Sequence, residues 1–173
     1  HALAPNSNTA KTPVVPTSGE DDNGRKKCTR KDIIALKRKL DALQVPTAGR
    51  RLVLCSDHVN DLLEDDQKFR DQYYNYTTGK IANMYGFEVY EFENCPYFTK
   101  EGTKVPFKNS PSGTDHQASF CFYTKRVFRA QGSTKMYYRD AQTNPDYQQN
   151  EVNFRHYYIV LPKKMEAIGA IYS

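Results

Sequence analysis

The chain has 173 residues, a formal net charge of +5 and 38% hydrophobic residues, including 13 Tyr and 9 Phe but no Trp. A chain of this length holds one domain or two joined lobes, and no apolar run approaches the ~20 residues that cross a bilayer. We therefore expect no membrane partner. The many tyrosines suit surfaces that are covered in an assembly, although a β-rich monomer would also account for them.

The first half of the chain predicts an arm followed by helices around one strand. Residues 1–27 are rich in Asn, Ser, Thr, Pro and Gly, which predicts a flexible arm or linker before a domain over 28–173. A helix over 30–43 begins at a Thr29-x-x-Asp32 capping pattern. The predicted elements that follow are a buried strand over 51–55, a helix capped by Ser56, and a helical or irregular stretch over about 66–74 that breaks at Thr77-Thr78-Gly79.

The second half predicts mainly strands. Residues 79–92 are β-rich, and 93–117 form a long polar loop, which in a compact domain is usually functional. The remaining predicted elements are a strand over 118–123, a short helix over 124–130, a strand over 135–139, a connector over 140–150, and closing strands within 150–173. Short helices alternating with strands indicate the α+β class.

Charge is unevenly distributed along the chain. Segment 25–39 has a local charge of +7, from eight cations against Asp32, whereas segment 57–71 has a local charge of −4. The cations are Arg25, Lys26, Lys27, Arg30, Lys31, Lys37, Arg38 and Lys39; the candidate acidic counterpart is Asp57, Asp61, Glu64, Asp65 and Asp66. Such segments could attract identical copies head to tail, and they are also typical of two solvated helices.

No pattern in the sequence predicts catalysis. The four cysteines lie far apart, without CxxC spacing, which favours free thiols formed in a reducing cytoplasm. Ser56-Asp57-His58 contains the residue types of a hydrolase triad, but neighbours on one helical turn point in different directions. Phosphate-binding glycine loops are missing from the sequence. We therefore expect no enzyme and no catalytic, cofactor-binding or metal residues, and no small-molecule substrate.

Three stretches carry a resemblance to a known family. They are Thr29-Arg30-Lys31-Asp32-Ile33 through Val45-Pro46 and Gly49-Arg50-Arg51-Leu52-Val53-Leu54; Gly79-Lys80-Ile81 with Tyr85-Gly86-Phe87-Glu88-Val89-Tyr90; and 118–130 with the closing strands. In order and spacing they resemble the C-terminal portion of the major capsid (coat) proteins of tailed double-stranded DNA bacteriophages, the Hong Kong phage fold. The resemblance covers about residues 29–173. The chain departs from the family at Cys55-Ser56-Asp57, where relatives often have Pro, and over 93–117, which does not align.

The resemblance implies the peripheral plus axial domain portion of that fold, without its N-terminal arm, extended loop and spine helix. It further implies a structural subunit of a phage or prophage icosahedral capsid, self-assembling into pentamers and hexamers that enclose double-stranded DNA. The implied partners are identical subunits, with scaffold, portal and packaged DNA as further candidates. The implied location is the virion, after assembly in the bacterial host cytoplasm.

An alternative function stays open from the residues alone. The basic segment 25–39 could neutralise several phosphates, which predicts a nonspecific nucleic-acid-binding module with salt-sensitive affinity. The segment lacks the interleaved aromatic residues of a single-strand binder, and the chain has no recognition-helix or zinc-finger signature.

Overall fold

A computed structural model describes the chain except for residues 1–11, 23, 74–79, 107, 144–145 and 147. It divides the chain into two compact units: one comprises residues up to Val127 together with Pro162–Ser173, and the other is Phe128–Leu161. The predicted boundary between an arm over 1–27 and a domain over 28–173 stays a prediction, since residues 1–11 lie outside the described part. None of the helices in the described part is long and apolar enough to span a membrane.

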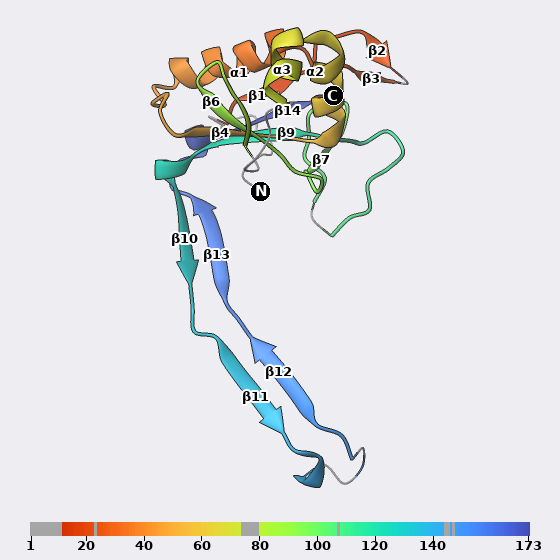
Figure 1. Cartoon of the computed structure of the whole chain (residues 1–173), viewed down its shortest axis with the longest axis vertical. Coiled ribbons are helices and arrows are strands. Elements are labelled where there is room, and N and C mark those ends of the chain that lie inside the picture. Colours follow the sequence, from red (N-terminus) through yellow and green to blue (C-terminus); the bar gives the residue numbers. More distant parts are fainter. Residues whose placement is uncertain (1–11, 23, 74–79, 107, 144–145, 147) are drawn as a thin grey trace. The chain divides into compact units, whose positions relative to one another are not determined.

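The first unit is built on a six-stranded mixed sheet, in agreement with the predicted α+β class (Figure 1). Its strand order is β1-β14-β9-β4-β6-β5. The strands are β1 (Val14–Pro16), β4 (Arg50–Leu54), β5 (Lys80–Met84), β6 (Phe87–Glu91), β9 (Ser119–Tyr123) and β14 (Ile168–Tyr172). The β1–β14 and β4–β6 pairs are parallel, and the other neighbours are antiparallel.

Three helices, α1 (Arg30–Ala42), α2 (Ser56–Asp65) and α3 (Gln67–Tyr73), cover one face of this sheet (Figure 1). Apolar residues at helical spacing put Ile33, Leu36 and Leu40 of α1 into the core beside Leu52 and Val89 of the sheet. The predicted helices and the predicted strand at 51–55 are thereby confirmed to within one or two residues. The predicted break at 77–79 lies outside the described residues.

The two main helices begin in different ways. At α1 the Asp32 carboxylate accepts the Thr29 backbone N–H at 2.8 Å, which confirms the predicted capping pattern. At α2 the N-cap is Cys55, without a side-chain cap, and Ser56 is the first helical residue. The prediction that Ser56 caps this helix is therefore wrong. Strand β4 ends at Leu54, so the capping position falls on Cys55, one residue before the predicted one.

Arg50 stabilises the loop between α1 and β4 through hydrogen bonds. Its side chain is 1% exposed, and it donates to Asp41 at 2.7 Å, to the Pro46 carbonyl at 3.0 Å, and to the Val45 carbonyl. The loop carbonyls would otherwise lie unpaired beside the core, so the guanidinium fixes the route by which the chain enters the sheet.

Two segments expected to be irregular contribute short strands. Within 12–27, β1 pairs with the last strand of the sheet, and β2 (Asp21–Asp22) pairs with β3 (Arg25–Lys26). Val15 is 5% exposed, so this part of the expected arm belongs to the packed unit. Within 93–117, β7 (Tyr97–Phe98) pairs with β8 (His116–Gln117), and Phe98 is fully buried.

The second unit is a ribbon of paired strands, here called the ribbon (residues 128–161). Strand β10 (Val127–Gln131) pairs with β13 (Tyr158–Pro162), and β11 (Lys135–Arg139) pairs with β12 (Glu151–Arg155) (Figure 1). The strand at 135–139 was predicted. The predicted helix over 124–130 is wrong, since only Thr124–Arg126 forms a 3-10 turn before β10 begins. Of the predicted closing strands, 151–161 belongs to the ribbon and β14 alone closes the sheet.

Candidate subunit interface

The two oppositely charged segments partly meet within one chain. Arg25 donates through both terminal nitrogens to Asp61, at 2.6 and 2.8 Å. Lys27 lies 2.7 Å from Glu64. The β2–β3 hairpin thus carries the start of the basic segment onto the acidic side of α2. These four charges are paired within the chain. Fewer charged side chains of the two segments are therefore free to contact another molecule.

Asp61 is the centre of this contact. Its carboxylate also accepts the Cys28 backbone N–H at 2.8 Å, so both oxygens are held. Burial alone would raise the pKa of Asp61, but the hydrogen bonds from Arg25 and Cys28 outweigh it and hold the pKa below its usual value. The same Asp61 hydrogen bond raises the pKa of Arg25. This ion pair therefore belongs to the fold.

The other charges of the two segments are mostly exposed. Lys37 pairs with Asp41 at 2.8 Å on α1, and Lys39 donates to the Val14 carbonyl at 2.6 Å. Besides Lys39, four cations of the basic segment are exposed and take part in none of the ion pairs found among the described residues: Lys26, Arg30, Lys31 and Arg38. Of the acidic set, Asp57 and Asp65 are exposed, whereas Asp66 is buried and accepts the Lys68 backbone N–H.

His58 forms a contact that the sequence did not indicate. Its Nδ1 lies 2.7 Å from the Ser119 hydroxyl, which also accepts the Cys55 backbone N–H at 3.1 Å. His58 and Ser119 are both 0% exposed. Desolvation lowers the pKa of His58 to about 4, so the ring is neutral at neutral pH. A serine and histidine sealed in the core cannot meet a substrate, and the pair instead joins α2 to β9.

The remaining reactive groups are also sequestered. All four cysteines are buried, and burial raises the pKa of Cys95 and of Cys121 to about 12. Among the described residues, no three His, Cys, Asp or Glu side chains gather in a metal-binding group. A pocket of about 770 Å³ under the 93–117 loop is lined by Phe92, Tyr97, Val105 and Phe120. The pocket lining includes Lys104 but no Asp or Glu, so it does not combine an acidic with a basic side chain as acid–base catalysis would require.

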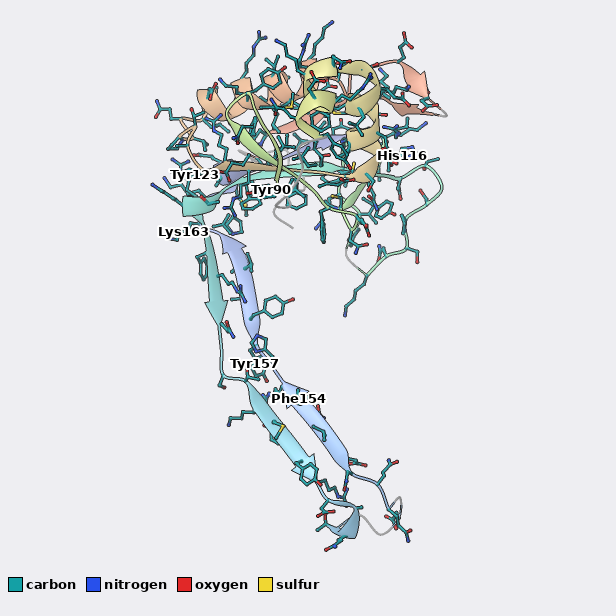
Figure 2. All side chains as sticks on the ribbon, in the orientation of Figure 1. Tyr90, His116, Tyr123, Phe154, Tyr157 and Lys163 are labelled. Carbon is teal, nitrogen blue, oxygen red and sulfur yellow. The ribbon has the colours of Figure 1, made fainter. Side chains whose placement is uncertain are left out.

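The ribbon presents the most unusual surface of the molecule. Apart from the half-buried Ala141, every ribbon residue whose burial is described is exposed. Its exposed large apolar side chains are Phe128, Met136, Tyr137, Tyr138, Val152, Phe154, Tyr157, Tyr158, Ile159, Val160 and Leu161. Figure 2 labels two of them, Phe154 and Tyr157, on the ribbon. Monomers rarely show so many exposed apolar residues together, and a surface of this kind is typical of one that a further polypeptide surface covers.

The sequence predicted strands at 135–139 and within 150–173 but did not indicate this surface. Apolar residues such as Met136, Val152 and Phe154 favour strands with one covered face. Periodicity reports that a face is to be covered, but it carries no information about which molecule covers it. The clearest sequence indication of a covered strand in the ribbon is the run Tyr158-Ile159-Val160-Leu161. This run is apolar on both faces of its strand.

Comparisons with known proteins give a result only at the level of structure. No protein-family model matches the sequence, and no curated protein matches it. A structure described as Mycobacterium phage Che8 matches with a TM-score of 0.61 and 12% identity, over 94% of this chain and 53% of that chain. A capsid structure of the cyanophage P-SCSP1u matches with a TM-score of 0.55 and 14% identity, over 92% of this chain and 53% of that chain.

A third match is the asymmetric unit of the mature capsid of bacteriophage PhiM1, with a TM-score of 0.50 and 14% identity. It covers 93% of this chain and 51% of that chain. This chain therefore spans about half the length of the solved structures it matches. At these identities the matches establish a shared fold, which agrees with the fold expected from the sequence.

Proposed function

We propose that this chain, which has the fold of the tailed-phage major capsid proteins, is a structural subunit of a phage or prophage capsid. In this proposal identical copies associate into pentamers and hexamers, which form an icosahedral shell around double-stranded DNA. The observation that carries the proposal is the ribbon, whose apolar residues are exposed in the single chain although the fold is one found in phage capsids. The proposal assigns the chain no catalytic role.

The charge pattern supplies a second, weaker element of the proposal. Rings of identical subunits need two unlike surfaces that meet head to tail. The exposed cations Arg30, Lys31 and Arg38 on α1 and the exposed acids Asp57 and Asp65 on α2 could supply them. The charges joined within the chain, such as Arg25 and Asp61, are excluded from this role. Scaffold, portal and packaged DNA are further partners, with the virion as the final location after assembly in the host cytoplasm.

Sedimentation velocity of the purified chain over a wide concentration range tests the proposal. We expect the weight-average sedimentation coefficient to rise with concentration, because copies cover one another's ribbons. Arg38→Glu should weaken association if the α1 cations take part, while Lys125→Glu is a matched exposed charge reversal outside both charged segments. A chain that remains monomeric up to about 1 mM, where contacts worth only about 4 kcal/mol would be detected, would contradict the proposal.

A nonspecific nucleic-acid-binding role remains the second candidate, because Lys26, Arg30, Lys31 and Arg38 are exposed. Fluorescence anisotropy with duplex DNA, repeated across salt concentrations, separates the two functions. A binding module would hold DNA at physiological salt with a steep salt dependence, and neutralising the four cations would flatten that dependence. A capsid subunit that contacts DNA only within a shell should bind weakly as a single chain.

A further inference from the structure

One serine hydroxyl joins the start of helix α2 to strand β9. Ser119 Oγ lies 2.7 Å from His58 Nδ1 and accepts the Cys55 backbone N–H at 3.1 Å. The Cys55 thiol lies at the same place, with Sγ 3.6 Å from Ser119 Oγ and 3.6 Å from the Gln117 carbonyl oxygen. Because Cys55 is the N-cap of α2, these contacts hold the first turn of the helix against the sheet.

This geometry suits a neutral His58 ring and not a protonated one. A neutral ring has one N–H and one acceptor nitrogen, and the Ser119 hydroxyl can pair with Nδ1 in either tautomer. The ring is 0% exposed, and among the described residues Nε2 has no hydrogen-bond partner. With a second proton, Nδ1–H has to donate to Ser119 Oγ, so the hydroxyl proton turns towards Cys55 Sγ. Nε2–H then belongs to a charged ring in the core without an acceptor, which is costly.

The charged groups that face His58 do not compensate for this cost. Burial has the largest effect and lowers the pKa of His58 to about 4. Asp61 on the same helix and Asp32 on α1 favour the protonated ring, whereas Arg25 in β3 disfavours it. Both oxygens of Asp61 already accept hydrogen bonds, from Arg25 and from the Cys28 backbone N–H. A protonated ring therefore gains a suitable environment only by reaching water.

We propose that the His58–Ser119 contact is an acid-sensitive switch: when His58 takes up a proton from solvent, the first turn of α2 separates from β9 and the Cys55 thiol becomes accessible, while the sheet stays folded. A local opening of this kind exposes little of the core and needs less free energy than global unfolding. The neutral ring stabilises the closed contact fully above about pH 6.5, and this effect is lost as the pH falls towards 4. The switch operates within one chain and does not depend on the association of copies.

The buried cysteines are probes of local and global opening. Cys55 lies at the switch, whereas Cys121 lies within β9 opposite Leu52 and Gly169, so its thiol reports unfolding of the sheet. A pyridyl disulfide modifies accessible thiols in acid as well as at neutral pH, and peptide mass spectrometry identifies each modified cysteine. Burial raises the pKa of Cys55, so the closed form offers no reactive thiolate and labelling measures opening.

His58→Gln removes the titrating group but keeps a side chain that can hydrogen-bond to Ser119. Between pH 7 and pH 5, we expect Cys55 labelling to rise at least about tenfold more in the parent chain than in His58→Gln, because the open form binds the proton more tightly. Cys121 should stay unlabelled over the same period. His156→Gln removes an exposed histidine of the ribbon, and this matched control should behave like the parent chain.

Two results would overturn the switch. One is an equal pH dependence of Cys55 labelling in the parent chain and His58→Gln. The other is simultaneous labelling of Cys55 and Cys121, which would mean that the whole sheet opens and the contact does not act locally. If His58→Gln does not fold, the Cys55 rate of the parent chain is divided by that of a free thiol at each pH. A ratio that does not rise between pH 7 and pH 5 then overturns the inference.

Discussion

At the scale of single residues, the Arg25–Asp61 pair should be the ion pair that matters most for stability. Both side chains are largely buried, with 13% and 4% exposure, and Asp61 also holds the Cys28 backbone N–H. Asp61→Asn leaves a cation without its counter-charge and should lower the free energy of unfolding by about 2–3 kcal/mol. Urea denaturation measures this.

Glu64→Gln is the matched control, because Glu64 lies on the same helix as Asp61 but its side chain is 63% exposed in its pair with Lys27. This change should cost less than about 1 kcal/mol. Equal effects of the two substitutions would show that Asp61 is no more than a surface partner.

The buried His58 predicts a loss of stability in mild acid. Desolvation lowers its pKa from 6.5 to about 4, and protonation would leave the unpartnered Nε2 charged in the core. Asp61 and Asp32 oppose the shift, and Arg25 adds to it. The unfolded chain therefore binds the proton first. The stabilisation by neutral His58 is complete above about pH 6.5 and is lost as pH falls towards 4, by on the order of 3 kcal/mol.

Urea denaturation of the parent chain and of His58→Gln, from pH 7 to pH 4, measures this loss. Gln keeps a hydrogen-bonding group near Ser119 but does not titrate, so the variant's unfolding free energy should change much less over this range. Asp61, whose pKa is held low, contributes its own loss only at lower pH. A parent and variant with parallel pH profiles would contradict the assignment to His58.

Local contacts of single residues were predictable, and distant ones were not. Thr29 and Asp32 are three positions apart, so their spacing alone predicted the cap. His58 and Ser119 are separated by 61 positions, and nothing in either local sequence indicates the other. The contact between Asp61 and Arg25 was not predicted: the opposite charges of the two segments were recognised, but their meeting within one chain depends on the β2–β3 hairpin.

At the scale of elements, the two helix starts should respond differently to substitution. Asp32 accepts the backbone N–H groups of Thr29, at 2.8 Å, and of Ser18, at 3.2 Å, so Asp32→Ala should lower the unfolding free energy by about 1–2 kcal/mol. Ser56 caps nothing, and Ser56→Ala should stay within about 0.5 kcal/mol. Thermal unfolding of both variants checks the contrast, and a large cost at Ser56 would contradict the observed cap at Cys55.

Elements whose own residues show a clear apolar pattern were predicted well. The apolar positions of α1 recur at helical spacing, and β4 is a short apolar run, so both were found near their observed bounds. The segment 124–130 was predicted as a helix, whereas Val127–Gln131 forms a strand because it pairs with residues about 30 positions later. Likewise β1 exists as a strand because β14 offers it an edge, which its three residues could not reveal.

At the scale of the whole molecule, one sheet with its helices forms a unit with its own core, whereas the described residues of the ribbon include no buried side chain. The fold class and the resemblance to capsid proteins were available from the order of motifs along the sequence, and the structural matches agree with them. The exposure of the ribbon's apolar residues could not be predicted from the sequence. Periodicity indicates that a face is covered but not which part of which molecule covers it.

Electron cryomicroscopy of the species formed at high concentration shows whether identical copies of this chain build the rings of a shell. We expect rings of five or six identical copies. Isolated monomers, or assemblies without such rings, would overturn the proposed capsid function.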